Sequence, residues 1–218
     1  MMLELYAHPF SSYCWKVLIP LYENATPFKY RILEQEFPEN GAEFGRLWPI
    51  GKFPLLVDDG RPVMESSVII EHLQRHHPGP VTFIPEGDAG LEVRMLDRIF
   101  DNHVMGQMQR VVADALRGPE RHDPVEVEQA KAALQKSYAW LDGWMEGREW
   151  AVAGAFSLAD CAAAPSLFYA DWVDPIPEAL ANLGGYRARL LARPSVARAI
   201  DEARPYRAYF PLGAPERD

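Results

Sequence analysis

Two short motifs in the first third of the chain have residue types and spacing that suit the binding of a small ligand. The first is Gly51-Lys52-Phe53-Pro54-Leu55, and the second, Glu65-Ser66, begins eleven residues after the proline. Proline lacks a backbone N–H and holds the preceding residue extended, so Phe53 is expected to present its own N–H and C=O like an unpaired sheet edge. A carboxylate and a hydroxyl beside such an edge suit a peptide-like ligand with a free amino group.

A simpler interpretation of the same residues is structural. Pro54 then only breaks a strand, and Ser66 only caps a helix. The surrounding sequence predicts such elements, because residues 54–57 are typical of a short buried strand and Asp58-Asp59-Gly60 of a turn. Residues 62–64 then return as the partner strand before a helix begins near Ser66.

A third motif lies at the N-terminus. Leu3-Glu4-Leu5-Tyr6 alternates like a strand, and Ser11-Ser12-Tyr13-Cys14 opens a helix that is predicted to reach about Glu23. Serine is a favoured N-cap because its oxygen accepts a hydrogen bond from a free N–H of the first turn. The same helix end carries the positive pole of the helix dipole, so a thiol placed there has its pKa lowered.

Taken in order, Ser-Ser-x-Cys-Trp-Lys-Val, Gly-Lys-Phe-Pro and Glu-Ser resemble the cytosolic glutathione transferases, most closely their serine-type zeta and theta patterns. The resemblance covers essentially the whole chain. It implies a thioredoxin-like α/β N-terminal domain followed by an all-α C-terminal helical bundle. It also implies glutathione as co-substrate, a small hydrophobic electrophile as second substrate, no metal, and a homodimer.

The resemblance assigns roles to individual residues. Ser11 matches the hydroxyl that donates a hydrogen bond to the glutathione sulfur. Phe53 and Pro54 match the backbone clamp on the cysteinyl unit, which implies a cis bond between them. Glu65 and Ser66 match the pair that holds the γ-glutamyl end.

Fewer residues of this sequence match the family positions that bind the glycyl end of glutathione. Lys52 falls where the family often has Gln or Lys near that end. However, Trp48-Pro49 stands where Asn-Pro is common, and the long loop expected over residues 34–47 holds only Arg46 as a basic residue. Capture of the γ-glutamyl end is therefore better supported than capture of the glycyl carboxylate.

The chain is predicted to divide near Pro78. Residues 1–78 form the glutathione-binding domain, residues 79–90 are a linker rich in Pro and Gly, and residues 91–218 are helical because apolar residues recur there at helical spacing. Within the helical part, Ser157 and Asp160 are spaced as a capping box, with Pro165 expected to bend or end the helix. Residues 213–218 are expected to be a loose tail.

Composition agrees with a globular cytoplasmic protein. The 218 residues suffice for two small domains, and the net charge of −9 argues against nucleic-acid binding, which needs a basic face. Cys14 and Cys161 are too few for a disulfide framework and suit a reducing compartment. No signal peptide or membrane-spanning apolar run is found in the sequence.

Several alternatives stay open at this point. Ser12, Cys14 or Tyr6 could activate the thiol instead of Ser11. His72 and His76 have the i,i+4 spacing of zinc ligands, but no third ligand is evident and a solvated helix face is expected. By analogy of fold, the electrophile pocket between the domains is expected to be lined by Tyr13, Met105, Met108, Gln109, Tyr169 and Trp172.

The reaction itself also stays open. Transfer of glutathione to an electrophile is favoured. Glutathione-dependent isomerase, reductase or lyase chemistry is a second possibility, although Tyr13 replaces the cysteine that zeta-type isomerases carry directly after the serines. A non-catalytic binding module built on the same fold is the third.

Overall fold

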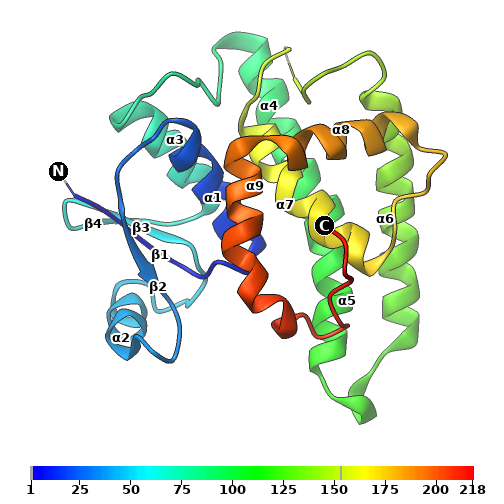
Figure 1. The fold of residues 1–218 in the computed structure, drawn as a ribbon, viewed down its shortest axis with the longest axis horizontal. Coiled ribbons are helices and arrows are strands. Elements are labelled where there is room, and N and C mark those ends of the chain that lie inside the picture. Colours follow the sequence, from blue (N-terminus) through cyan, green and yellow to red (C-terminus); the bar gives the residue numbers. More distant parts are fainter. Residues whose placement is uncertain (1, 153) are drawn as a thin grey trace.

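The computed structural model describes residues 2–152 and 154–218. The elements of its N-terminal part are, in chain order, β1 (Leu3–Ala7), α1 (Ser12–Glu23), β2 (Lys29–Ile32), α2 (Pro38–Leu47), β3 (Leu55–Asp58), β4 (Arg61–Val63) and α3 (Ser66–His76). The strands form one sheet with the order β2-β1-β3-β4, in which β1 pairs parallel with β2 and antiparallel with β3. Figure 1 shows this sheet and helices α2 and α3 on one side of the molecule and the long helices on the other.

The hairpin of β3 and β4 forms as predicted. Leu56 lies opposite Val63, and Asp58 lies opposite Arg61. The two residues between the strands, Asp59 and Gly60, both have positive φ, as a tight hairpin turn with the twist of the sheet requires. This hairpin sets where the chain enters α3.

The prediction of a long loop over residues 34–47 was wrong, because most of this stretch forms helix α2 (Pro38–Leu47). Proline suits the first position of a helix, where its missing N–H would have no partner in any case. The helix is hard to recognise in the sequence because Gly41 and Gly45 weaken helical propensity and because it buries only one large apolar side chain.

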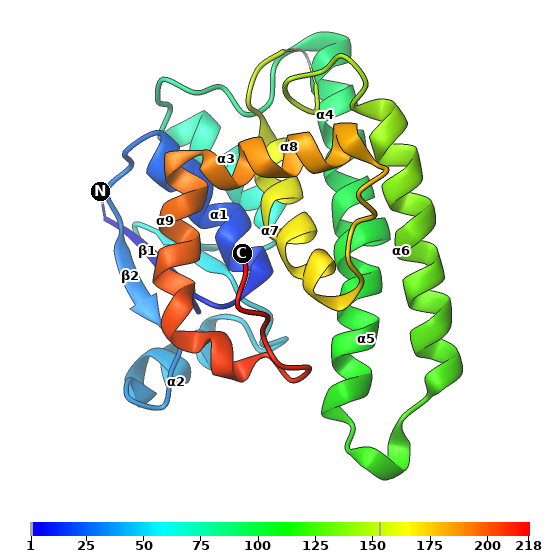
Figure 2. The same ribbon diagram turned by 45° about the vertical axis from the view of Figure 1, so that its right-hand side comes forward.

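The C-terminal part is helical, as predicted. Its elements are α4 (Gly87–Ile99), a π-helical segment η1 (Phe100–Met105), α5 (Gly106–Leu116), η2 (Pro119–Arg121), α6 (Pro124–Trp144), α7 (Leu158–Val173), α8 (Ala181–Ala192), α9 (Pro194–Ala203) and η3 (Arg204–Tyr209). Figure 2 shows α5 and α6 as long neighbouring helices, with α8 crossing above α7. The predicted fold class, a thioredoxin-like α/β domain followed by an all-α bundle, is confirmed. No helix among residues 2–152 and 154–218 is both long and apolar enough to cross a membrane.

Helix α4 begins four residues before the predicted start of the helical part at residue 91, so residues 87–90 belong to α4 and not to the linker. Gly90 does not break this helix. A Cβ atom at that position would collide with the carbonyl oxygen of Pro85, so glycine is needed for close approach of the chain.

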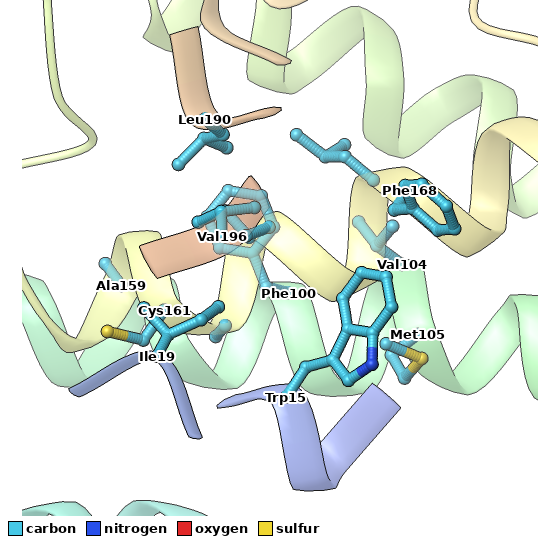
Figure 3. Close-up of a cluster of buried hydrophobic side chains, with 14 of the residues drawn as sticks. Trp15, Ile19, Phe100, Val104, Met105, Ala159, Cys161, Phe168, Leu190 and Val196 are labelled. Atoms are coloured by element: carbon cyan, nitrogen blue, oxygen red, sulfur yellow. The ribbon is translucent and has the colours of Figure 1, made fainter. Parts of the chain in front are cut away.

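One continuous core joins the two parts. Trp15 and Ile19 of α1 pack against Phe100 of the π-helical segment and Phe168 of α7, and all four are buried (Figure 3). The ring centroids of Trp15 and Phe168 lie 4.9 Å apart. Because α1 carries Ser11 at its start, this packing fixes the serine relative to the helical bundle.

Helix α7 is buried along its whole length, and the capping box at its start is present. The Asp160 carboxylate accepts hydrogen bonds from the Ser157 backbone N–H at 2.8 Å and its hydroxyl at 2.9 Å. It also accepts bonds from the Ala151 N–H and the Tyr186 hydroxyl. The helix does not end at Pro165, because packing on all sides outweighs the one backbone hydrogen bond that proline removes.

The prediction of a loose tail over residues 213–218 was wrong, because two of its side chains form ion pairs with the rest of the protein. The Arg217 guanidinium pairs with the carboxylate of Asp171 on α7, and it also donates to the Asp171 carbonyl oxygen. The Asp218 carboxylate pairs with Arg204 and Arg207 of η3. These ion pairs join residues that are distant in sequence, which composition alone does not reveal.

Candidate functional site

The structure brings all six residues expected to hold the ligand to one cavity of about 790 Å³. This cavity, here called the polar cavity, lies between the N-terminal domain and the start of the helical bundle. Its lining includes residues from α1, the β3 approach, the start of α3 and the α4–η1 region. The six expected residues in that lining are Ser11, Lys52, Phe53, Pro54, Glu65 and Ser66.

Ser11 is the N-cap of α1. Its backbone is extended, and its Oγ accepts a hydrogen bond from the Cys14 N–H at 3.4 Å. This bond uses a lone pair of the hydroxyl, so the hydroxyl hydrogen is free to be donated to another acceptor. The geometry therefore directs an O–H donor into the cavity at the positive end of a helix.

Phe53 enters the cavity through its backbone. The Phe53–Pro54 peptide bond is cis, and Pro54 is buried while Phe53 is exposed. Within the described part of the chain, no backbone hydrogen bond is found for the Phe53 N–H or C=O. These two groups are therefore available to pair with an extended ligand backbone.

Glu65 and Ser66 mark the start of α3. Glu65 has φ 68° and ψ 116°, an uncommon conformation for a residue with a side chain, and such outliers cluster at ligand-binding positions. Its side chain makes no capping hydrogen bond to α3. The first N–H groups of this helix thus lack a capping side chain, and they form a natural site for a carboxylate next to Ser66.

Lys52 is exposed at the rim of the polar cavity, whereas Arg46 of α2 is absent from the part of its lining that lies among the described residues. The structure therefore supplies one basic side chain on the side where the glycyl carboxylate is expected. This agrees with the weaker sequence signal for that end of the ligand.

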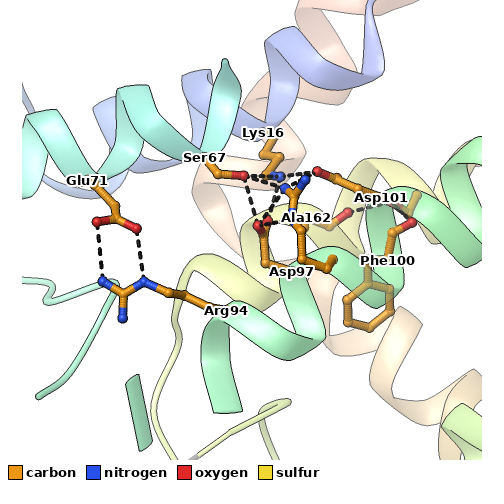
Figure 4. Close-up of polar contacts among 10 residues, drawn as sticks. Lys16, Ser67, Glu71, Arg94, Asp97, Phe100, Asp101 and Ala162 are labelled. Atoms are coloured by element: carbon orange, nitrogen blue, oxygen red, sulfur yellow. Dashed lines mark hydrogen bonds and ion pairs between the residues drawn. The ribbon is translucent and has the colours of Figure 1, made fainter. Parts of the chain in front are cut away.

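A buried ionic network behind the polar cavity was not anticipated from the sequence. Lys16 of α1, only 1% exposed, lies 2.5 Å from an oxygen of Asp97 and 2.7 Å from an oxygen of Asp101 (Figure 4). Its Nζ also donates to the Ser67 hydroxyl, which in turn donates to Asp97. Arg98 donates to the same Ser67 hydroxyl and to both aspartates.

This network holds the first turn of α3 against α1 and α4. Three of its members, Ser67, Arg98 and Asp101, also line the polar cavity. Two sequence signals would have pointed to it. Lys16 is a lone charge inside the apolar run from Cys14 to Ile19, and Asp97 and Asp101 are spaced i,i+4 among apolar residues of a helix.

A second, apolar cavity of about 310 Å³ adjoins the first. Ser11, Phe53 and Gln109 line both cavities. Of the residues expected by fold analogy in the electrophile pocket, Met108, Gln109 and Tyr169 are in its lining. Tyr13 instead lines the polar cavity, and Met105 is buried in the core. Trp172 is not part of the lining, but its ring packs edge-to-face against Phe210, which is.

The C-terminal segment supplies much of the wall that fold analogy missed. Tyr209 is the last residue of η3, and it lines the apolar cavity together with the following Phe210 and Pro211. They are held there by the ion pairs of the tail described above. Their position depends on contacts over the whole length of the chain, so neither periodicity nor motif spacing predicts it.

His8 is a further residue of the apolar cavity. Its Nδ1 accepts a hydrogen bond from the Phe10 N–H at 3.0 Å, which places any single ring proton on Nε2. Burial lowers the pKa of His8 below its ordinary value, and the nearby Glu34 only partly opposes this effect. At neutral pH the ring is therefore neutral, and its Nε2 lies 3.6 Å from Oε1 of Glu34, too far for a hydrogen bond.

The alternative thiol-activating groups are poorly placed. Cys14 is fully buried, and burial raises its pKa to about 12 despite hydrogen bonds with Ser11 and His8, so it is not a thiolate at neutral pH. Tyr6 is buried in a small cluster with Phe44, and burial and Glu43 raise its pKa. Ser12 is buried and lines only the apolar cavity.

Comparison with known proteins identifies relatives over most of the chain. Residues 5–81 match the family model "Glutathione S-transferase, N-terminal domain", and residues 104–194 match "Glutathione S-transferase, C-terminal domain". The solved structure of a glutathione S-transferase from Methylobacillus flagellatus with glutathione bound superposes with a TM-score of 0.78. It is 26% identical and covers 90% of this chain and 98% of its own.

Two curated relatives differ in what their names describe. A probable maleylacetoacetate isomerase of Vibrio cholerae is 27% identical over 221 residues, which cover 94% of this chain and 98% of the relative. FtsZ-localized protein A of Caulobacter vibrioides is 27% identical over 171 residues, 74% of either chain. Relatives of similar distance thus carry names of different functional kinds.

Proposed function

This chain belongs to the glutathione S-transferase family, and we propose that it transfers the glutathione thiolate to a small apolar electrophile. Glutathione occupies the polar cavity in this proposal, and the electrophile occupies the apolar cavity. The observation that carries the proposal is that Ser11 lines both cavities. A sulfur atom held at its hydroxyl would therefore face the second substrate directly.

The polar cavity offers complementary groups for each part of glutathione. The free N–H and C=O of Phe53 would pair with the cysteinyl backbone. The uncapped first turn of α3, with Ser66, would bind the carboxylate of the γ-glutamyl unit, and the Glu65 carboxylate would bind its ammonium group. Lys52 would attract the glycyl carboxylate.

Ser11 would act as a hydrogen-bond donor, and not as a nucleophile or a base. Its lone pair is engaged by the Cys14 N–H, and its hydrogen would be donated to the glutathione sulfur. A fall of two units in the thiol pKa corresponds to about 2.7 kcal/mol of preferential thiolate stabilisation. One charge-assisted hydrogen bond together with a helix N-terminus can supply that amount.

The reaction that follows is a simple transfer. The glutathione thiol first loses its proton to solvent, and the thiolate sulfur then donates an electron pair to the electrophilic carbon. A carbon–sulfur bond forms, and the leaving group departs with the electron pair of the bond that breaks. The enzyme contributes thiolate stabilisation and alignment of the two substrates.

The decisive experiment is an ultraviolet difference titration of the protein with glutathione across neutral pH. A thiolate band well below the pKa of free glutathione is expected in the wild type, and its midpoint should rise in Ser11→Ala. Saturable binding without a thiolate band would contradict transfer and favour a binding module. Failure to bind glutathione would contradict the assignment of Phe53, Glu65 and Ser66.

Isomerisation is a second candidate, supported by the likeness over nearly the full chain to a protein named as a probable maleylacetoacetate isomerase. The two reactions share the thiolate and differ in product. Glutathione is consumed in transfer and regenerated in isomerisation. Measuring free thiol over many turnovers therefore separates them. The glutathione-dependent reductase that would use Cys14 is disfavoured, because that thiol is buried and protonated.

We also propose, from family membership, a cytoplasmic homodimer. Exposed apolar side chains on α3 and α4 support an association through these helices, among them Val68, Leu91 and Met95. Light scattering coupled to size-exclusion chromatography should give twice the mass of the chain, and Leu91→Glu should shift the protein towards the monomer. A monomeric wild type would contradict this proposal.

A further inference from the structure

Three side chains at the end of the sheet far from Ser11 converge on one point. The Nε2 atoms of His72 and His77 each lie 2.8 Å from Oδ2 of Asp58. All three potential ligand atoms lie within 4.8 Å of one another. The side chains are between 11% and 16% exposed, so they are partly shielded yet open to an ion from solvent.

The local backbone explains this arrangement. Asp58 is the last residue of β3, and His72 lies near the end of α3. His77 is the C-cap of that helix, with φ −133° and ψ 55°, so the chain leaves helical geometry there and turns the imidazole back towards Asp58. His76, four residues after His72, is instead exposed. Its ring packs at a tilt against the His72 ring, with centroids 4.5 Å apart.

The chemistry of the cluster suits a divalent transition-metal ion. Imidazole nitrogens and a carboxylate oxygen are ordinary ligands of Zn²⁺, and three protein ligands leave one position for water. The cluster also lies at the C-terminus of α3, the negative pole of the helix dipole, which favours a cation.

We propose that Asp58, His72 and His77 bind a zinc-type divalent metal ion that cross-links β3 to α3. An ion bound between these three side chains would replace the two hydrogen bonds that join the histidine Nε2 atoms to Oδ2 of Asp58. Both elements begin at the polar cavity, β3 just after Pro54 and α3 at Ser66. The ion would thus fasten the far ends of the two elements that carry glutathione-binding residues, about 13 Å along β3 from Pro54.

The test uses the full chain after treatment with a chelator. Zn²⁺ titration by calorimetry is expected to give one ion per chain, and Co²⁺ is expected to give visible absorption bands of a site with nitrogen and oxygen ligands. Removing a residue that only hydrogen-bonds a metal ligand typically weakens metal binding about 10- to 100-fold. Removing a ligand itself, as in Asp58→Asn or His77→Gln, should therefore weaken Zn²⁺ binding by at least about 100-fold. The matched control, His76→Gln, should bind Zn²⁺ like the wild type.

Each outcome decides the proposal. Loss of binding in the ligand variants with retention in His76→Gln supports it, provided that glutathione affinity and circular dichroism show these variants to be folded. His72→Gln serves as an independent ligand variant if Asp58→Asn is unstable. Absence of stoichiometric binding in the wild type would overturn it. Loss in His76→Gln with retention in His77→Gln would also overturn it, because it would assign the ion to an exposed histidine pair.

Discussion

The Nζ atom of Lys16 lies 2.7 Å from Oδ2 of Asp101, and both side chains are almost entirely buried although 85 residues separate them. The pair connects α1 of the sheet domain to the π-helical segment of the bundle. Because Lys16 also donates to Ser67, it positions the first turn of α3, where the γ-glutamyl end of glutathione is proposed to bind. A single buried ammonium group thus serves both the domain interface and the site.

Replacing Lys16 by Met should therefore destabilise the protein strongly. Asp97 and Asp101 would keep buried negative charge with only Arg98 beside them, and removal of one partner of a buried ion pair typically costs about 3–5 kcal/mol. The KM for glutathione should also rise, because Ser67 loses a partner. Urea unfolding and steady-state kinetics measure the two effects.

Arg98→Ala is the matched control for this variant. The Arg98 side chain contacts the same aspartates but is 52% exposed, so solvent screens its charge and its loss should cost about 1 kcal/mol or less. Equal destabilisation by the two variants would contradict the central position of Lys16 in the network.

Ser11→Ala should lower kcat/KM for glutathione transfer. Loss of a hydrogen bond to a charged group costs about 1.5–3 kcal/mol, which corresponds to roughly a 10- to 100-fold slower reaction. The kinetic pKa of the bound thiol should rise by the equivalent amount. Ser11→Thr keeps both the capping oxygen and the O–H donor, and it should retain most of the activity.

Cys14→Ala should leave this kinetic pKa unchanged, because the Cys14 thiol is buried and protonated at neutral pH. A large loss of activity in Cys14→Ala, with little loss in Ser11→Ala, would instead indicate chemistry at the cysteine. Thermal unfolding of both variants separates an effect on folding from an effect on the thiol.

The buried Cys14 thiol should make stability fall at alkaline pH. In the folded protein its pKa is raised to about 12 by burial, whereas in the unfolded chain it is near the ordinary value of 9.0. Above 9.0 the folded state binds more protons than the unfolded state, so the free energy of unfolding decreases with pH, by at most about 1.4 kcal/mol per unit for this group. Below 9.0 both states hold the proton, and Cys14 adds no slope.

Urea unfolding at pH values below and above 9.0 tests this expectation. Other buried groups also titrate in the alkaline range, among them Tyr13, whose pKa is raised to about 12 mainly by burial. Cys14→Ala isolates the cysteine contribution, because only the cysteine slope disappears. The same alkaline slope in both proteins would show that Cys14 ionises equally in the folded and unfolded states.

Arg217→Ala should change the electrophile side of the reaction and spare the glutathione side. Arg217 ties the tail to Asp171, and the tail holds Tyr209 and Phe210 in the wall of the apolar cavity. We expect an altered KM for the electrophile with an unaltered KM for glutathione. Arg198→Ala, which breaks an exposed ion pair with Glu202 on α9, is the control and should change neither.

Local sequence signals predicted the parts of the fold that depend on neighbouring residues. The Ser11 cap, the β3–β4 hairpin and the capping box of Asp160 each follow from a few adjacent side chains. Helix α2 was missed because its two glycines weaken the pattern. The network around Lys16 was missed because it joins residues far apart in the chain.

The site divides in the same way. The residues expected to hold glutathione come from short motifs, and they line one cavity. The wall of the apolar cavity consists mainly of residues in the second half of the chain, from Met108 onwards. The shape of this cavity therefore depends on how the helices and the C-terminal tail pack together. A sequence therefore indicates the first substrate far better than the second.

The two adjoining cavities also have a consequence for evolution. Apart from Ser11, Phe53 and Gln109, they share no lining residue among those described. If the chain performs the proposed transfer, mutations in α5 or in the segment from Tyr209 to Pro211 would therefore alter which electrophiles are accepted and leave most residues assigned to glutathione unchanged. Gene duplicates with this architecture would then diversify in substrate range without first losing their chemistry.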